Sequence, residues 1–303
     1  MRVAITGASG FIGSALVASL RSSGESVVRF VRRPAGTPVA PDEASWDPGA
    51  GTIDRAALEG VDAVVHLAGE GIGERRWTAE QKERILTSRV DGTRLVASTL
   101  ASMAGGGAGA PVLVNASAVG YYGLRGDEEL TEESPAGTGF LAEVVKAWEA
   151  ATAPASEAGG RVVLLRSGIV LGRHGALGRM LPFFKLGLGG PLGNGHQWWP
   201  WVALDDVLGL IRHAIATPSL SGPMNVTSPN PARNKDVARA LGRVLHRPSL
   251  LPVPAFALSL LMGRELTHEV ILAGQRALPA VAEATGYRFV HPELEPALRA
   301  AVA

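Results

Sequence analysis

A short apolar strand leads directly into a glycine-rich loop at the start of the chain. Met1–Ile5 has the composition of a strand, the loop Thr6-Gly-Ala-Ser-Gly-Phe-Ile-Gly13 follows it, and Ser14–Ser22 has the pattern of a helix. In such a unit the first glycine permits a sharp turn, the second lets a pyrophosphate approach the backbone, and the third lets the helix pack close to the strand. The sequence therefore predicts a dinucleotide site, with a tight turn without a ligand as the alternative. The loop residues predicted to bind are Gly7, Ser9, Gly10, Phe11, Ile12 and Gly13.

Strand and helix patterns alternate over the first 170 residues. The expected strands are Arg2–Thr6, Ser26–Val31, Asp62–Leu67, Pro111–Asn115 and Arg161–Arg166, and the expected helices are Ser14–Ser22, Ala79–Met103 and 140–158. This alternation predicts an α/β fold with a Rossmann-type, doubly wound parallel sheet that binds ligands at the carboxyl ends of its strands. The glycine run Gly105–Gly109 predicts a flexible loop.

After Leu171 the alternation breaks, and it returns between about 201 and 228. Residues 172–200 are rich in glycine, proline and aromatic residues, and residues 229–303 contain helical patterns divided by prolines. We therefore expect a nucleotide-binding domain formed by residues 1–171 and about 201–228. Residues 172–200 and 229–303 are expected to form a smaller, interleaved α/β substrate domain.

Composition excludes several classes of function. The net charge is +1, charged residues make up 19% of the chain, and no long basic run is present, so no nucleic-acid partner is expected. The absence of cysteine excludes disulfides, thiolate metal sites and a cysteine nucleophile, and the scattered histidines predict no metal site. The apolar stretch Leu250–Met262 is too short to cross a membrane, and the N-terminus has no secretory pattern. We expect a cytoplasmic protein with a small-molecule substrate, and a homodimer is left open.

The end of the second expected strand indicates which dinucleotide binds. An acidic residue at this place accepts the adenosine ribose hydroxyls of NAD, whereas arginine suits the 2′-phosphate of NADP. The strand ends in Arg32 and Arg33, and no carboxylate occurs before Asp42. These arginines predict NADP as the cofactor, and the alternative is a charged strand end exposed to solvent.

The spacing GxxGxxG resembles the short-chain dehydrogenase/reductase superfamily, and TGASGFIG resembles its extended branch, which includes nucleotide-sugar epimerases. Further sequence segments resemble an atypical, epimerase-like subgroup of the NAD-dependent epimerase/dehydratase family that is often labelled as related to cell-division inhibitors. These segments are Leu67–Glu70, Ser117–Gly123, Arg166–Gly172 and Leu186–Trp201. The resemblance covers most of the chain and implies NADP binding without the usual catalytic tyrosine. It implies no particular substrate.

The resemblance also implies further cofactor-binding residues. A turn of small residues would lie over the adenine and its ribose, and Glu70 would accept a ribose hydroxyl or, alternatively, begin a helix. The turn consists of Leu67, Ala68 and Gly69. Backbone groups of Ile169 and Val170 would bind the nicotinamide carboxamide, and a buried strand and turn is the alternative there.

The usual catalytic helix of this superfamily carries a YxxxK pair, with a serine or threonine upstream. The lysine binds the nicotinamide ribose and lowers the pKa of the tyrosine, which exchanges a proton with substrate. Here Lys146 occupies the lysine position, unless it is an ordinary exposed lysine, and Ala142 stands four residues before it. Ser117 is the nearest candidate for the upstream hydroxyl, although an alternative alignment places Ala118 there. The candidate proton donors are Ser117, Tyr121 and His196.

An aromatic segment, His196-Gln-Trp-Trp-Pro-Trp201, contains half of the six tryptophans. It is expected to line the cleft between the domains as a mobile lid, or alternatively to close the domain interface as a rigid plug. His196 is either a replacement proton donor or a structural residue. Asp205 and Asp206 resemble a metal or acid pair, but their position at a helix start favours a structural role.

Two functions are compatible with this sequence. The first is an NADP(H)-dependent oxidoreductase or epimerase-like enzyme that acts on a small polar substrate between the domains. The second is a non-catalytic NADP(H)-binding sensor or regulatory protein, which the missing tyrosine would explain.

Overall fold

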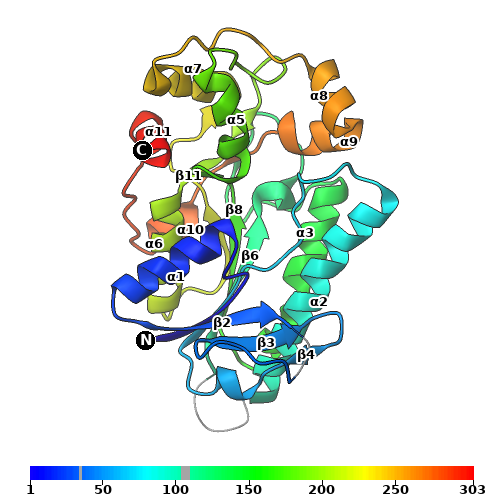
Figure 1. Ribbon diagram of the computed structural model, residues 1–303, viewed down its shortest axis with the longest axis vertical. Coiled ribbons are helices and arrows are strands. Elements are labelled where there is room, and N and C mark those ends of the chain that lie inside the picture. The colour runs from blue at the N-terminus through cyan, green and yellow to red at the C-terminus, as the bar shows by residue number, and fades with distance from the viewer. Residues whose placement is uncertain (34–35, 104–109) are drawn as a thin grey trace.

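The computed structural model describes residues 1–33, 36–103 and 110–303, and an eight-stranded sheet lies at its centre (Figure 1). The strand order is β12-β8-β6-β5-β1-β2-β3-β4, and all neighbours are parallel except the antiparallel pair β3 and β4. The strands are β1 (Arg2–Thr6), β2 (Ser26–Arg32), β3 (Glu43–Asp47), β4 (Thr52–Ile53), β5 (Ala63–His66), β6 (Val112–Ala118), β8 (Val162–Ser167) and β12 (Gly222–Val226). The predicted doubly wound α/β fold is confirmed, but the sequence patterns missed β3 and β4. The predicted loop at Gly105–Gly109 lies outside the described residues.

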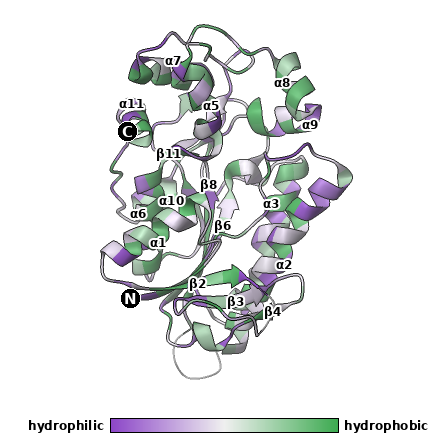
Figure 2. Cartoon of the chain, in the orientation of Figure 1, coloured by the Kyte–Doolittle hydropathy of each residue, from purple (hydrophilic) through white to green (hydrophobic). Residues whose placement is uncertain are grey.

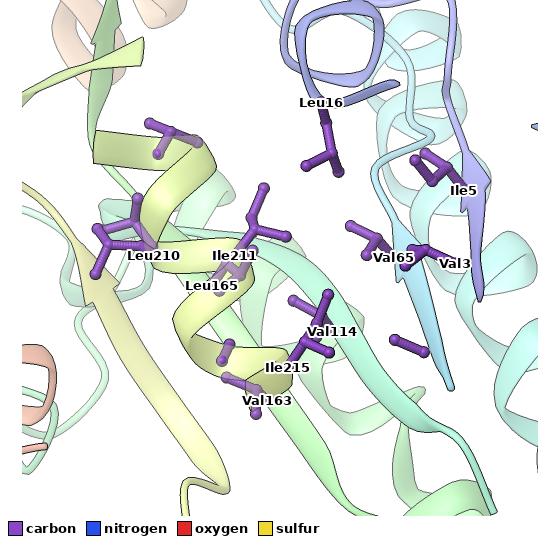
Figure 3. Close-up of a cluster of buried hydrophobic side chains, with 14 of the residues drawn as sticks. Val3, Ile5, Leu16, Val65, Val114, Val163, Leu165, Leu210, Ile211 and Ile215 are labelled. Carbon is purple, nitrogen blue, oxygen red and sulfur yellow. The ribbon is translucent and has the colours of Figure 1, made fainter. Parts of the chain in front are cut away.

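Apolar layers cover both faces of this sheet, because alternate residues of a strand point to opposite sides. Val3 and Ile5 of β1 belong to a buried cluster with α1 (Phe11–Ser22) and α6 (Leu204–Ala216). Figure 3 shows this cluster, in which side chains of α6 lie beside the strand residues. Ala4 belongs to a second cluster with α2 (Ala79–Met103) and α4 (Ala153–Glu157). Each buried Val, Leu or Ile contributes roughly 1.5–3 kcal/mol, so these two layers fix the sheet that carries the candidate site.

A further group of helices gathers beyond the carboxyl ends of the central strands, at the top of Figure 1. The members of this group are α5 (Gly175–Lys185), α7 (Asn234–Leu245), α8 (Ala255–Met262), α9 (Arg264–Leu266) and α11 (Leu294–Val302). A buried cluster joins α5, α7 and α11 to β9 (Ile169–Leu171) and β11 (Trp201–Ala203), which pair with each other. The sequence patterns missed α5, which contains Pro182. The boundaries of the two expected domains stay a prediction.

Short elements complete the chain between these groups. Helix α3 (Phe140–Ala150) precedes β8, and α10 (Ala280–Ala284) packs near β12. The remaining strands form two small pairs, β10 (Trp198–Trp199) with β13 (Ala232–Arg233) and β7 (Glu129–Leu130) with β14 (Arg276–Ala277).

Helix α8 exposes an apolar surface. Phe256, Leu260 and Leu261 are each at least 74% exposed, and α8 is strongly hydrophobic in Figure 2. Across the described ranges, no helix is both long and apolar enough to cross a membrane.

Candidate functional site

The glycine loop between β1 and α1 folds too tightly to admit side chains at two of its three glycines. Gly7 has a φ of +68°, and a Cβ atom there would lie 2.8 Å from the carbonyl carbon of Leu67. A Cβ atom at Gly13 would overlap the carbonyl oxygen of Gly7. Gly10 is exposed at the start of α1, whose first amides donate no hydrogen bond to a capping side chain. This bare helix N-terminus is a cradle that fits a pyrophosphate.

Substitution of the third glycine tests the cradle. We expect Gly13→Ala to lower the free energy of unfolding by about 1–3 kcal/mol, because the new methyl group overlaps backbone atoms of Gly7 and Ala8. Gly10→Ala is the matched control, since its methyl group would meet only the Gly7 oxygen, at 3.3 Å. Urea denaturation of both variants measures the difference, and equal stability of the two would contradict this account.

The two arginines at the end of β2 are both exposed. Arg32 lies opposite Trp46 of β3, and the amide of Arg33 donates to the Trp46 carbonyl. Neither guanidinium forms an ion pair with any residue in the described ranges. Both side chains can therefore reach an anionic group at this edge of the sheet.

The turn that follows β5 lies directly against the glycine loop. Leu67 and Ala68 are half-buried in it, and Gly69 is exposed. The amide of Glu70 donates to Ser88 Oγ at 3.1 Å, and Gln81 donates to the Glu70 carboxylate at 3.3 Å. Glu70 does not begin a helix, because α2 starts only at Ala79. Its role toward a ribose stays a prediction.

The predicted nicotinamide segment forms β9. Ile169 and Val170 are half-buried and pair with Trp201 and Val202 of β11. The Ile169 amide donates to the Pro200 carbonyl at 2.7 Å. That amide is therefore engaged within the protein, and other backbone groups of the segment would have to contact a carboxamide.

A buried polar network connects the ends of β6 and β8 with α3. Ser117 Oγ donates to Glu149 at 2.6 Å, and the Arg166 guanidinium donates to both carboxylate oxygens of Glu149 at 2.9 Å. Arg166 also donates to the Tyr122 hydroxyl at 3.1 Å, which donates in turn to Asn225 at 2.7 Å. Burial alone would lower the pKa of Arg166, but hydrogen bonds and the charge of Glu149 raise it above its ordinary value. The sequence analysis missed this network apart from Ser117.

The three candidate proton donors fall in two separate places. Ser117 is 4% exposed and engaged with Glu149, while the ring of half-buried Tyr121 lies 3.5 Å from the Arg166 guanidinium carbon. His196 is exposed and lines a cavity of about 500 Å³, apart from this network. The structure therefore brings Ser117 and Tyr121 to one network and leaves His196 outside it. Their catalytic roles stay predictions.

Helix α3 packs against the loop that follows β6 through two aliphatic side chains. A Cβ atom at Gly120 would lie 3.5 Å from Leu141 and 3.9 Å from Val145, which are spaced by four residues. Ala142, at the position of the usual tyrosine, is buried, at 1% exposed. Lys146 is 45% exposed and forms a 3.0 Å ion pair with Glu143. Leu141 and Val145 thus face Gly120, and the roles of Ala142 and Lys146 stay predictions.

The aromatic segment divides into an exposed and a buried part. Trp199 and Trp201 are 4% and 0% exposed, as a rigid plug requires. Trp198 instead lines the 500 Å³ cavity, and its indole N–H donates to Asp127 at 2.7 Å. The guanidinium of Arg233 lies over its ring, 4.5 Å from the centroid. We therefore assign the lining of the cavity to Trp198 alone among these tryptophans.

The acidic pair at the start of α6, Asp205 and Asp206, has a structural role, although it does not cap the helix. Asp206 is fully buried and accepts hydrogen bonds from the amides of Val290 and His291 and from the Tyr287 hydroxyl. It makes no capping hydrogen bond to α6 itself. Asp205 lies 3.0 Å from the His291 ring. In the parts of the chain that the structure describes, no group of three or more acidic or histidine side chains is placed to hold a metal ion.

Comparison with known proteins agrees with this geometry. Residues 3–227 match the NAD dependent epimerase/dehydratase family, and residues 253–301 match a domain of unknown function, DUF1731. The chain belongs to the NAD dependent epimerase/dehydratase family. It is 44% identical to the epimerase family protein ML0860 of Mycobacterium leprae over 297 residues, which cover 98% of this chain and 94% of that protein.

Two solved structures are similar to the chain over its length. The human epimerase family protein SDR39U1, crystallised with NADPH, has a TM-score of 0.88 and 35% identity, with 99% of each chain covered. A nucleoside-diphosphate sugar epimerase from Corynebacterium glutamicum has a TM-score of 0.78 and 37% identity, and the match covers 100% of this chain and 58% of that one. The predicted family is thereby confirmed.

Proposed function

We propose that this protein binds NADP(H) and is an oxidoreductase or epimerase-like enzyme that acts on a small polar molecule. The bare N-terminus of α1, with Arg32 and Arg33 at the neighbouring strand end, is the observation that carries the proposal. The pyrophosphate would bind at the amides that follow Gly10, and the two arginines would bind the 2′-phosphate. The similar human protein was crystallised with NADPH, which supports this choice of cofactor.

The bound cofactor would supply hydride exchange, and the residues of this chain would orient the substrate. The cavity lined by His196, Trp198, Asp127 and Arg233 offers donors, acceptors and an aromatic wall, which suit a small polar molecule. Leu141 and Val145 can neither move a proton nor hold a charge. Any proton transfer would fall to Ser117, Tyr121, His196 or water.

The alanine at the position of the usual tyrosine, Ala142, favours a second function, a non-catalytic NADP(H)-binding sensor. Incubation of the protein with NADPH and a panel of small carbonyl compounds separates the two functions. Protein-dependent loss of nicotinamide absorbance supports the enzyme, whereas tight NADPH binding without turnover of any compound supports the sensor. A homodimer and a cytoplasmic location stay predictions.

Cofactor preference is the direct test of the binding site. We expect NADPH to bind more tightly than NADH, and the double variant Arg32→Ala/Arg33→Ala to lose about ten- to hundredfold in NADPH affinity, because hydrogen bonds to charged groups contribute about 1.5–3 kcal/mol. Arg239→Ala, which removes an exposed arginine of α7, is the control. Fluorescence titration measures both cofactors. Equal affinities of the wild-type protein for NADPH and NADH would refute the arginine assignment.

A further inference from the structure

Exposed apolar side chains are concentrated in two segments of the chain. Eight of the eleven large hydrophobic side chains that the described structure exposes belong to residues 183–188 and 250–261, and each of the eight is between 55% and 80% exposed. The first segment contains the end of α5, and the second contains α8. We call these eight side chains the apolar edge. A surface of this kind usually marks an interaction site.

The two segments run beside each other, so the apolar edge lies on one side of the molecule. The Gly193 amide donates to the Val253 carbonyl at 2.9 Å, and the Val253 amide donates to the Pro191 carbonyl at 2.8 Å. The Arg247 side chain donates to the Lys185 carbonyl at 3.0 Å. In Figure 1 the loop between α7 and α8 forms the upper boundary of the molecule, at the opposite end from β3 and β4. The apolar edge therefore lies away from the exposed part of the central sheet.

Helix α8 presents a fixed apolar face. Phe256 and Leu260 are four residues apart on one side of the helix and are 75% and 76% exposed, while Leu258 between them is 8% exposed. The Arg76 guanidinium donates to the Leu261 carbonyl at 3.2 Å and so holds the end of the helix. The helix is therefore anchored through one side, and its hydrophobic outer side (Figure 2) is open to an apolar partner.

The charge around the apolar edge has one sign. No aspartate or glutamate occurs in residues 174–204 or 237–264, whereas these stretches contain six arginine or lysine residues, although the net charge of the chain is only +1. Lys185, Arg247 and Arg264 are exposed and form no ion pair within the described ranges. The other three contact carboxylates or a carbonyl elsewhere in the chain. An apolar surface flanked by free cations suits a partner that is both apolar and anionic.

We propose that the apolar edge binds the surface of a membrane that contains anionic lipids. The outer side of α8 would enter the boundary between headgroups and acyl chains, and Lys185, Arg247 and Arg264 would lie against lipid phosphates. A second copy of the chain is a poorer partner, because a twofold interface places a surface against itself and would bring these cations together. Glu265, which follows Arg264, is engaged with Lys82 and does not compensate them. This inference goes beyond the proposed function and does not depend on the cofactor site.

Co-sedimentation of the full chain with lipid vesicles tests the proposal. We expect vesicles of phosphatidylcholine with about 30% phosphatidylglycerol to bind the protein about tenfold or more tightly than vesicles of phosphatidylcholine alone, and high salt to remove the difference. Each cation near an anionic surface strengthens binding about fivefold, so Lys185→Gln/Arg264→Gln should weaken it about twentyfold. Arg94→Gln, at an exposed position of α2, is the matched control.

The apolar contribution is tested separately. We expect Phe256→Asn/Leu260→Asn to weaken binding to the anionic vesicles about tenfold or more, because both side chains would leave water on binding. Val290→Asn, which changes an exposed apolar residue outside the apolar edge, should bind as the wild type does. All of these side chains are exposed, so the substitutions remove no buried packing, and thermal melts verify that each variant is folded.

The absence of cysteine permits a second, site-specific measurement. Leu260→Cys and Val290→Cys can each be labelled with a fluorophore whose emission depends on the polarity around it. We expect anionic vesicles to shift the emission of the label at position 260 to shorter wavelength and to leave the label at position 290 unchanged.

Three results would overturn the proposal. The first is no binding to either kind of vesicle, and the second is equal binding to both kinds. The third is a dimer in analytical ultracentrifugation that becomes a monomer in Phe256→Asn/Leu260→Asn, because a second copy of the chain would then cover the apolar edge.

Discussion

Glu149→Ala is expected to lower the free energy of unfolding by about 3–5 kcal/mol, as measured by urea denaturation. The Arg166 side chain is 4% exposed and donates two hydrogen bonds to the Glu149 carboxylate, which is itself 10% exposed. Removal of one partner from a buried ion pair leaves the other charge buried without compensation. The free-energy cost of that buried charge exceeds the net stability that the intact pair contributes. Ser117 would lose its acceptor as well.

The exposed pair between Glu143 and Lys146, on the same helix, is the matched control for this prediction. We expect Glu143→Ala to cost less than about 1 kcal/mol, because water screens an exposed ion pair. The double variant Glu149→Leu/Arg166→Met should recover part of the stability that Glu149→Ala loses, since it leaves no charge buried. A loss below 1 kcal/mol in Glu149→Ala would show that water reaches the network and that the pair is not enclosed.

This network also explains how α3 is fixed relative to the sheet. Ser117 lies opposite Arg166 in the paired strands β6 and β8, and Glu149 of α3 contacts both. Backbone amides of Phe140 and Leu141 donate to the Glu269 carboxylate at the other end of α3. Polar contacts at both ends therefore set the rotation of this helix, so that its aliphatic residues face Gly120.

Elements with a clear apolar pattern could be predicted from the sequence. Helix α2 has the predicted bounds Ala79–Met103, and β1 has the predicted bounds Arg2–Thr6. The buried residues of α2 follow the helical repeat of 3.6 residues, whereas β1 is an apolar run with four consecutive buried residues, as a parallel strand covered on both faces requires. The glycine loop was predictable for a different reason, because a side chain at Gly7 or Gly13 would overlap backbone atoms.

The elements that the sequence analysis missed lack such a pattern of apolar residues. The strand β3, Glu43–Asp47, contains charged and small residues and is held by its pairing with β2. Helix α5 begins at Gly175 and contains Gly178 and Pro182, which argue against a helix on local grounds. Burial of Leu177 and Phe184 against α7 and α11 stabilises it instead.

The parts of the candidate site that depend on distant contacts could not be read from local patterns. The spacing of four residues between Ala142 and Lys146 is correct for one helix face, but the same spacing also joins Leu141 and Val145. Only packing against Gly120 decides which pair faces the loop. The Arg166–Glu149 pair likewise arises from tertiary structure.

His66, at the end of β5, is a fully buried histidine beside the glycine loop. One ring nitrogen, Nδ1, lies 2.7 Å from the Thr6 hydroxyl, and the other has no hydrogen-bond partner within the described ranges. The ring also packs edge-on against Trp46, with 5.7 Å between centroids. An apolar enclosure of this kind disfavours the charged imidazolium, and burial lowers the pKa of His66 from 6.5 to about 4.

We therefore expect acid to destabilise the protein through His66. Between pH 6.5 and about 4 the unfolded chain binds a proton at this histidine and the folded protein does not, so stability falls as the pH falls and the loss is complete near pH 4. A pKa difference of this size corresponds to about 3 kcal/mol. The free energies of unfolding of the wild type and of His66→Asn, measured from pH 7.5 to pH 4, should therefore converge by about that amount, although the variant is less stable at neutral pH. His268→Asn, at an exposed position, should keep the wild-type pH dependence. Parallel curves for the wild type and His66→Asn would mean that water or a partner reaches the His66 ring in solution.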